Sequence, residues 1–250
     1  LLLHGSGGGF RSFAPQVEVL RFVGGDLDVD KALIKTRGPG IRATEEAMKV
    51  KTLSLHIADR VINGDSVSDP REFDGLRRRV VGPQLFPANL AAPAANSPLS
   101  LEALDAALDQ VDGPNALAMN KAVKRKLKKA ARANLGGDIR VEKNDFGYSI
   151  EVYDDYPILI VDYNEKGQRS IDFNEVGPGG GSTSTSLYVL HLGDSHVMGL
   201  QNGTMEVSDL GEIDAKPVLR TRLEWIVGMA VMHGRAVARI WGITSADITA

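Results

Sequence analysis

The chain lacks cysteine altogether, and this absence removes several kinds of chemistry at once. Without thiols there is no disulfide, no thiolate metal ligand and no cysteine nucleophile, and the redox compartment stays undetermined. No apolar run approaches the roughly 18 residues that a membrane span needs, so we expect the chain to lie outside the bilayer. The opening Leu1-Leu2-Leu3 is too short for a secretory signal and has no basic flank.

An excess of charge of either sign is also missing. The formal net charge is −3 and the isoelectric point is near 6.0, whereas a simple nucleic-acid binder is usually strongly basic. With 43% hydrophobic and 24% charged residues, the composition is that of an ordinary globular protein. Its 250 residues suffice for one large domain or two modest ones. The first residue is not methionine, which indicates processing or a fragment.

The beginning of the chain predicts an incomplete structure. Residues 1–14 are glycine-rich and predict a flexible arm. The stretches Val17–Val23 and Leu27–Ile34 favour strands, and Gly24-Gly25-Asp26 between them predicts a hairpin turn. A lone hairpin leaves an edge and a face unpaired, so we expect other copies of the chain to complete it. The candidate inter-subunit contacts are Val17, Val19, Phe22, Leu27, Lys31 and Lys35.

Three helices are predicted. Apolar residues recur at three- and four-residue steps from Thr44, the expected N-cap, to Ile62, and Asn63-Gly64 is a typical helix end. Ser97-Pro98 favours the start of a second helix, whose outer face is acidic. The third runs from about Asn120 to Asn134 and holds seven Lys or Arg residues between Lys121 and Arg132, with no acid among them.

The basic helix has two interpretations. It can face packaged nucleic acid and neutralise phosphates, with Lys124, Lys128 and Lys129 as the candidate DNA-facing residues. Alternatively it pairs with the acidic helix before it, or is a solvated face whose ion pairs contribute little. Base-stacking aromatic residues are missing from this helix, which favours the second interpretation.

The second half of the chain is mainly strands and turns. Segments such as Ser149–Tyr153 and Leu187–Leu192 favour strands, and the run Gly177 to Gly181 predicts a mobile loop. Residues Arg220 to Ile243 alternate in polarity and predict two strands that break near His233-Gly234.

One triplet deserves comparison with hydrolases. Gly193-Asp194-Ser195 resembles the nucleophile block of lipases and esterases that use a Gly-Asp-Ser triplet, in which an Asp and a His near the chain end generate the base. Those enzymes place the serine early, whereas here it is late and His233 has no Asp a few residues before it. A strand-to-strand turn is the favoured interpretation, and an esterase using Ser195 is the alternative.

The histidines do not form a metal-binding motif. The five are His4, His56, His191, His196 and His233. They can share a metal only by long-range convergence, and the spacing of His191 and His196 around Gly193 suits a turn better than a ligand pair. We therefore predict no catalytic residue, no metal site and no cofactor.

Several short segments occur together in a distinctive order. They are Ile62-Asn63-Gly64-Asp65, Phe73-Asp74-Gly75-Leu76, Leu101–Asp105, Asn115–Asn120, Gly199–Gly203, Asp209–Glu212, Arg220–Trp225 and Ala236–Ile243. Each is weak alone, but their order and spacing, over about Ile62 to Ile243, resemble the major capsid proteins of tailed bacteriophages of the Hong Kong 97 type.

This resemblance implies an α+β fold with a long spine helix, a peripheral domain, an axial domain, an extended β-hairpin loop and an N-terminal arm. The implied division is an arm over residues 1–14, an extended loop over 15–42, a peripheral domain over 43–98 and 211–250, and an axial domain over 99–210. Some members of the family cross-link a loop lysine to an asparagine of a neighbour. Lys31 and Lys35 lie in the candidate loop, but no motif identifies the asparagine or a catalytic carboxylate, so this chemistry is not carried over.

The resemblance also implies a structural function rather than an enzymatic one. Subunits would associate as pentamers and hexamers into the icosahedral shell of a tailed bacteriophage, assembled in the cytoplasm of a host bacterium. Implied partners are a portal, a scaffold or maturation protease, a possible cementing protein and the packaged double-stranded DNA, bound non-specifically, with no membrane partner. The alternative within this fold is an encapsulin-like nanocompartment, which encloses enzymes instead of DNA.

Overall fold

A computed structural model describes residues 17–133, 139–143, 149–213 and 216–249. The predicted arm and His4 lie outside these residues. The elements are β1 (Arg21–Asp30), α1 (Lys31–Arg37), α2 (Gly40–Asn63), α3 (Leu76–Arg79), β2 (Leu85–Pro87), α4 (Leu101–Gln110), β3 (Ala116–Met119), α5 (Lys121–Arg132), β4 (Ile139–Lys143), β5 (Ser149–Tyr153), β6 (Tyr156–Ile160), β7 (Thr185–Leu190), β8 (Val197–Gln201), β9 (Glu206–Glu212), β10 (Val218–Val231) and β11 (Val237–Ile243). Among the described residues, no helix combines the length and the apolar character that crossing a membrane requires.

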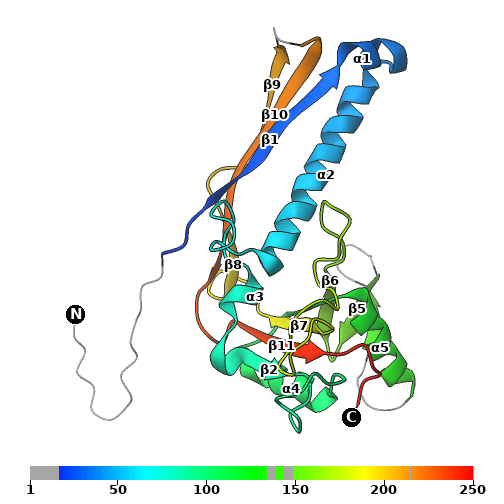
Figure 1. Cartoon of the computed structure of the whole chain (residues 1–250), viewed down its shortest axis with the longest axis vertical. Coiled ribbons are helices and arrows are strands. Elements are labelled where there is room, and N and C mark those ends of the chain that lie inside the picture. The colour runs from blue at the N-terminus through cyan, green and yellow to red at the C-terminus, as the bar shows by residue number, and fades with distance from the viewer. Residues whose placement is uncertain (1–16, 134–138, 144–148, 214–215, 250) are drawn as a thin grey trace, which may run out of the picture.

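The strands form two sheets. In the four-stranded sheet, β1 pairs antiparallel with β10 over its whole length, while β8 and β9 pair with other parts of β10. The seven-stranded sheet has the order β2-β11-β7-β3-β6-β5-β4. Figure 1 shows α2 and the long strands β1, β9 and β10 reaching away from the seven-stranded sheet, with α4 and α5 at its other end.

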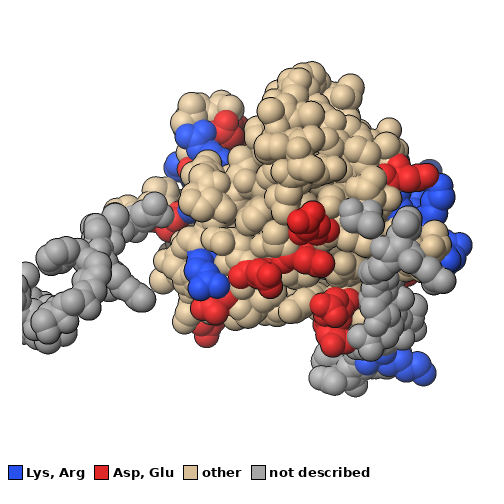
Figure 2. Space-filling model, turned by 90° about the horizontal axis from the view of Figure 1, so that it is seen from below, with Lys and Arg blue, Asp and Glu red and all other residues tan. Residues whose placement is uncertain are grey.

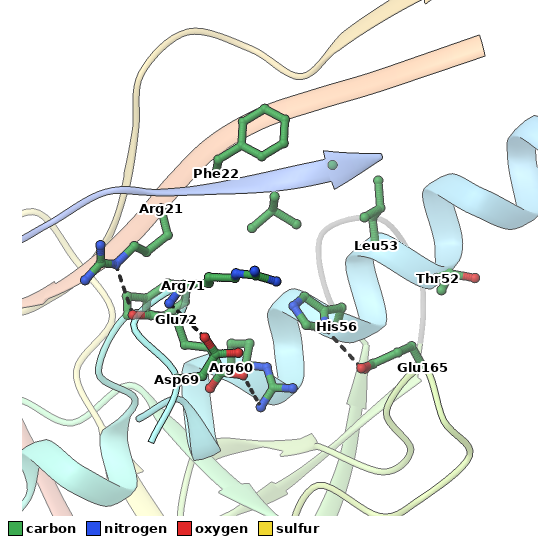
Figure 3. Close-up of a pocket in the computed structure, with 13 residues that line it drawn as sticks. Arg21, Phe22, Thr52, Leu53, His56, Arg60, Asp69, Arg71, Glu72 and Glu165 are labelled. Carbon is green, nitrogen blue, oxygen red and sulfur yellow. Dashed lines mark hydrogen bonds and ion pairs between the residues drawn. The ribbon is translucent and has the colours of Figure 1, made fainter. Parts of the chain in front are cut away.

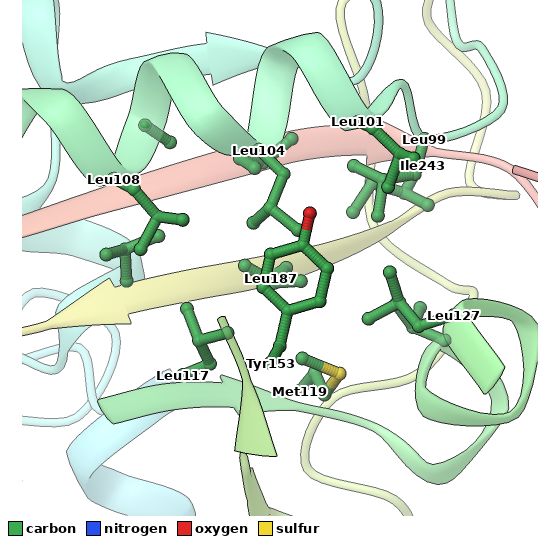
Figure 4. Packing of buried hydrophobic residues seen from close by; sticks show 14 of the residues in the cluster. Leu99, Leu101, Leu104, Leu108, Leu117, Met119, Leu127, Tyr153, Leu187 and Ile243 are labelled. Atoms are coloured by element: carbon green, nitrogen blue, oxygen red, sulfur yellow. The ribbon is translucent and has the colours of Figure 1, made fainter. Parts of the chain in front are cut away.

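One hydrophobic core lies between the seven-stranded sheet and the helices α4 and α5 (Figure 4). Leu104 of α4 and Leu127 of α5 are almost fully buried against Leu117 and Leu187 of the sheet. These leucines follow the three- and four-residue spacing of a helix and the alternation of a strand, so their apolar faces meet. Burial of this kind contributes roughly 1.5–3 kcal/mol per large side chain.

A second core joins the two sheets. The opposite face of β7, with Tyr188, packs with Leu76 of α3, Ile62 at the end of α2 and Val227 of β10. Of the α2 side chains, only those of Asp59 and Ile62 are buried, and all the others are half-buried or exposed. The helix is therefore anchored at its C-terminal end and projects from the core.

The predicted end of the long helix is confirmed. The Gly64 amide donates to the Arg60 carbonyl at 2.9 Å, and the Gly75 amide donates to the Gly64 carbonyl at 2.8 Å. A Cβ atom at position 64 would lie 2.3 Å from the Phe73 carbonyl oxygen. Only glycine permits this close backbone approach, which ties the helix end to the segment that follows.

The predicted hairpin over residues 17–34 is wrong. Gly24 and Gly25 lie inside the single strand β1, which is followed by helix α1, not by a second strand. A Cβ atom at Gly24 would lie 2.2 Å from the Leu223 carbonyl oxygen, so glycine here permits close pairing with β10. The Asp30 carboxylate accepts from the Ala32 amide at 2.7 Å and begins α1.

Two predicted helix starts are also wrong, whereas the third is confirmed. Helix α2 begins at Gly40 rather than Thr44, whose hydroxyl instead donates to the Gly40 carbonyl within the helix. Helix α4 begins at Leu101, because Ser97 pairs with the C-terminal segment through the Gly242 carbonyl. The basic helix begins after Asn120, whose side chain accepts from the Val123 amide at 2.7 Å.

The strand predictions for the second half hold well. β5 covers Ser149–Tyr153 as expected, and β10 and β11 are separated by the turn at His233-Gly234. The glycine-rich run from Gly177 is not a free loop, however. The Asn96 side chain accepts from the Gly179 amide at 3.1 Å and donates to the Gly180 carbonyl at 2.7 Å.

Candidate functional site

The predicted inter-subunit residues fall into exposed and paired groups. Val17, Val19 and Phe22 are 89%, 51% and 58% exposed, which is unusual for apolar side chains in one short segment. Leu27 is half-buried, Lys31 forms an ion pair with Glu212, and Lys35 is exposed in the last turn of α1. The three exposed apolar residues are thus the strongest candidates for contact with another protein.

The segment that carries them is not unsupported, contrary to expectation. Glu18 forms a two-pronged ion pair with Arg79, with both N–O distances 2.5 Å, and Arg79 also donates to the Met229 carbonyl at 3.2 Å. Leu20 packs so close to Gly228 that a Cβ atom there would lie 2.9 Å from Leu20 Cδ2. The chain itself therefore holds residues 18–30 in place, and exposes selected side chains on a fixed support.

Two cross-strand ion pairs lie on the exposed face of β1 and β10. Asp26 accepts from Arg222 at 2.7 and 3.0 Å, and Asp28 accepts from Arg220 at 2.6 and 2.7 Å. The hydrogen bond from each arginine holds the pKa of its aspartate below the usual range. These pairs lie directly opposite in the strand register, so they favour one alignment of the two strands.

The basic helix α5 finds its partners within the chain. The Nζ atoms of Lys124 and Lys128 lie 3.0 and 2.5 Å from the carboxylate oxygens of Glu151 in β5. The Nζ atom of Lys129 lies 2.6 Å from a carboxylate oxygen of Asp247. The hydrogen bond from Lys128 lowers the pKa of Glu151, and that from Lys124 adds to this effect against the opposing influence of burial. The alternative in which this helix pairs with the acidic helix α4 is wrong, and the candidate DNA-facing lysines have carboxylate partners elsewhere in the chain.

The acidic face of α4 has no such compensation. Glu102, Asp105 and Asp109 are exposed, and no lysine or arginine among the described residues forms an ion pair with them. Partial loss of hydration at its carboxyl group raises the pKa of Asp105, and the charges of Asp154 and Asp109 raise it further against the opposing effect of Tyr153. Figure 2 shows acidic side chains gathered near the middle of the end seen from below, with basic side chains toward its edges.

The groove between β1 and α2, with a volume of about 340 Å³, is lined by charged side chains together with apolar ones such as Phe22 and Leu53 (Figure 3). His56 of α2 lies 3.0 Å from Glu165, and Arg60 lies 2.9 Å from Glu72. Arg21 of β1 donates to the Glu72 carbonyl at 3.1 Å. These contacts connect β1 and α2 to the segment around Glu72 and to Glu165, while the Arg60 Nε and a Glu165 carboxylate oxygen keep no hydrogen-bond partner in the described part of the chain.

Three of the five histidines do come together, which sequence spacing did not predict. The rings of His191 and His196 stack at 3.5 Å, and His233 contacts His196 edge-on at 4.7 Å. Parallel stacked rings do not point their nitrogens at one common position, and the described residues contain no cluster suited to holding a metal.

The same geometry disfavours the esterase alternative. Ser195 is exposed and makes no hydrogen bond to a histidine within the described residues. The Nδ1 atom of His233 accepts from the Arg235 amide at 3.1 Å, and no carboxylate of the described residues forms an ion pair with this ring. A serine nucleophile needs a base within hydrogen-bond reach and a group that orients that base.

Comparison with known proteins gives structural matches only. No family model and no curated protein matches the chain. The encapsulin of the holo-SrpI complex from Synechococcus elongatus PCC 7942 matches with a TM-score of 0.68 and 17% identity, over 92% of this chain and 76% of that chain. The head structure of Helicobacter pylori bacteriophage KHP40 matches with a TM-score of 0.58 and 10% identity, over 94% and 80%. The capsid of an empty GTA particle gives 0.52 and 12%, over 94% and 80%.

These matches agree on one architecture. The chain has the Hong Kong 97-type capsid fold. The α+β class and the long projecting helix expected from the sequence are thereby confirmed. In this fold family, as represented by its solved structures, both phage heads and an encapsulin occur, so the fold is common to the two alternatives raised from the sequence.

Sequence reasoning missed two features of the Hong Kong 97-type fold as this chain builds it. It did not place Glu18 against Arg79, because residues 61 apart in the chain carry no local signal of their pairing. It also did not find the contact between the two turns that carry the histidines. Their positions at two strand breaks were visible, but only the sheet topology brings those breaks together.

Proposed function

We propose that this chain is a shell-forming structural protein and, more finely, the major capsid protein of a tailed double-stranded DNA bacteriophage. Copies associate as pentamers and hexamers into a closed icosahedral shell. The observation that carries the proposal is the Hong Kong 97-type fold, matched over 92–94% of the chain by proteins whose names include capsid, head and encapsulin.

The exposed apolar segment supports the same proposal. Val17, Val19 and Phe22 leave large apolar side chains in water on a segment that Glu18 and Arg79 hold in place. Burial of such side chains in a neighbouring copy would favour association, and in a closed array each contact is repeated at every equivalent position. In this proposal, residues 99–210 surround the symmetry axes, and the remaining parts contact neighbouring subunits. A portal, a scaffold or maturation protease and a cementing protein are the partners expected of such a shell.

The second candidate is an encapsulin-like nanocompartment. The match to the Synechococcus elongatus encapsulin, with its TM-score of 0.68, supports this candidate, because the fold is common to both kinds of shell. Cargo separates the two: double-stranded DNA in a phage particle, folded protein in a compartment. The internal partners of Lys124, Lys128 and Lys129 do not favour DNA contact through α5, although non-specific contact elsewhere on a shell is compatible with the proposal.

Point substitutions test assembly more cleanly than a deletion. Removing residues 17–34 would delete β1, which pairs with β10 over its whole length. We therefore choose Val17→Asp, Val19→Asp and Phe22→Asp combined, with Val67→Asp as a matched control because Val67 is 73% exposed in a different part of the chain.

Purified protein at high concentration, viewed by negative-stain electron microscopy, should form closed particles for the unaltered chain and for Val67→Asp. The triple variant should keep its melting temperature and circular dichroism but form no closed particles. Normal shells from the triple variant would refute the role of this segment. A compact monomer of the unaltered chain under every assembly condition would refute shell formation itself.

A further inference from the structure

The histidine cluster lies where the chain passes between the two sheets. Three connections join the sheets: one from β1 to β2, one from β7 to β8 and one from β10 to β11. His191 and His196 lie in the β7–β8 connection, and His233 lies in the β10–β11 connection. Two of the three connections between the sheets therefore meet at this histidine cluster.

Backbone hydrogen bonds join these two connections directly. The Met232 amide donates to the His196 carbonyl at 2.8 Å, and the His191 amide donates to the Ala236 carbonyl at 3.0 Å. The three rings belong to the same two connections, and the His196 ring lies between the other two. Its centroid is 3.5 Å from that of His191 and 4.7 Å from that of His233. Repulsion between the rings would therefore pull directly on the two backbone hydrogen bonds that hold these connections together.

The hydrogen bonds at two of the rings determine where their protons lie. The Nδ1 atom of His191 lies 2.6 Å from the Asp112 carbonyl, which can only accept, so this nitrogen carries the proton. The Nδ1 atom of His233 accepts from the Arg235 amide at 3.1 Å. A second proton on the His233 ring would have to occupy that nitrogen and would break the bond to the amide.

Little nearby negative charge offsets protonation. Partial burial lowers the pKa of His196, and the His191 and His233 rings lower it further, while Asp112 opposes them. The other charged residues in these turns are Asp194, which is exposed, and Arg235, whose guanidinium donates to the Gln110 carbonyl at 3.1 Å. Protonation of more than one ring would place like charges within a few ångströms of each other.

We propose that His191, His196 and His233 form a proton-sensitive joint between the two sheets. When the rings are neutral, they pack together and hold the two connections in contact. When they are protonated, the like charges separate the connections and loosen the joint. This inference concerns the single chain and does not depend on shell formation.

The direction of the pH response follows from proton linkage. The folded chain binds a proton at His196 less readily than an unfolded chain does, because its pKa lies below the ordinary value of 6.5. The stability that neutral His196 contributes is therefore complete above about pH 6.5 and is lost as the pH falls below that value.

Amide hydrogen exchange of the full, unassembled chain tests the joint. It would be measured at about pH 7.5 and about pH 5.0, on either side of the histidine range, with correction for intrinsic exchange rates. Peptides covering residues 191–197 and 231–237 should lose at least roughly five-fold more protection at the lower pH than peptides from α4. His196→Gln should abolish most of this difference.

Two further variants keep the test decisive. His233→Gln removes an exposed ring and should also flatten the response, which covers the case that His196→Gln fails to fold. His56→Gln, outside the cluster and beside Glu165, is the matched control and should retain the full response at both connections. An unchanged response in both cluster variants, or no response in the unaltered chain, would overturn the proposal, whether or not the chain assembles into shells.

Discussion

The distal blade and the body of this molecule are stabilised in different ways. By the distal blade we mean α1, residues 40–55 of α2, β1, β9 and residues 218–224 of β10; by the body we mean the seven-stranded sheet with α4 and α5. In the blade most side chains are exposed or half-buried, with Val29, Thr221 and Leu223 as exceptions. In the body, all six residues of β7 and all four of β3 are buried.

The difference lies in where the folding free energy of each part comes from. The body removes a continuous set of apolar side chains from water, which is the main source of folding free energy. The blade relies on the β1–β10 ladder and on pairs such as Asp26–Arg222, which are partly solvated. The blade is held in place by its attachment to the body. Contact with another protein surface would therefore stabilise the blade more than it would stabilise the body.

The largest effect is expected from opening the buried ion pair of the body. Arg239 and Glu175 have side chains 7% and 2% exposed and lie 2.8 Å apart, and Arg239 also donates to the Ser186 hydroxyl at 2.9 Å. Arg239→Ala leaves Glu175 buried without a cation and should lower the free energy of unfolding by roughly 3–5 kcal/mol. Urea denaturation would measure this. Arg220→Ala in the blade, the matched arginine change, should have a far smaller effect, and equal losses would contradict the comparison.

A core truncation should sharpen the contrast further. Leu104→Ala in α4 removes a side chain with 0% exposure and should cost roughly 2–5 kcal/mol. Leu27→Ala in β1 truncates the same side chain at a half-buried position and should cost clearly less, because water already reaches part of it. Melting temperatures of the two variants provide the measurement. A larger loss for Leu27→Ala would show that the blade, not the body, holds the fold.

A smaller loss is expected from adding one methyl group to β1. Gly24→Ala places a Cβ atom against the Leu223 carbonyl oxygen and should cost about 1–3 kcal/mol through strand separation. Gly40→Ala, at the start of α2 with no atom within 4 Å of the new Cβ, is the control and should be neutral or slightly stabilising. Thermal unfolding of both variants would measure the difference. A neutral Gly24→Ala would mean that β1 is not closely paired with β10.

The smallest effect is a pH response of the basic helix. Because Lys128 and Lys124 lower the pKa of Glu151, its ion pairs contribute stability above the ordinary glutamate value of 4.5 and lose it as the pH falls below that value. The melting temperature should therefore fall less between about pH 7 and about pH 4 in Glu151→Gln than in the unaltered chain. Glu102→Gln, on the uncompensated acidic face, should leave the fall unchanged. Identical curves for Glu151→Gln and the unaltered chain would exclude this contribution.

Much of the local structure was determined by the sequence itself. The end of α2 at Asn63-Gly64, the capping of α5 by Asn120 and the break between β10 and β11 all follow from residues within a few positions of the feature. Such signals are local because a cap or a turn is satisfied by neighbouring backbone groups. The order of short segments likewise sufficed to predict the Hong Kong 97-type fold.

Only the tertiary structure decided what the local signals left ambiguous. Gly24-Gly25 is compatible with a turn or with a close strand contact, and the Leu223 carbonyl selects the second. Lys124 and Lys128 are compatible with several acidic partners, and the position of β5 selects Glu151. The meeting of His191, His196 and His233 requires two distant strand breaks to coincide. In each case the deciding partner is far away in sequence, so no pattern within the segment encodes it.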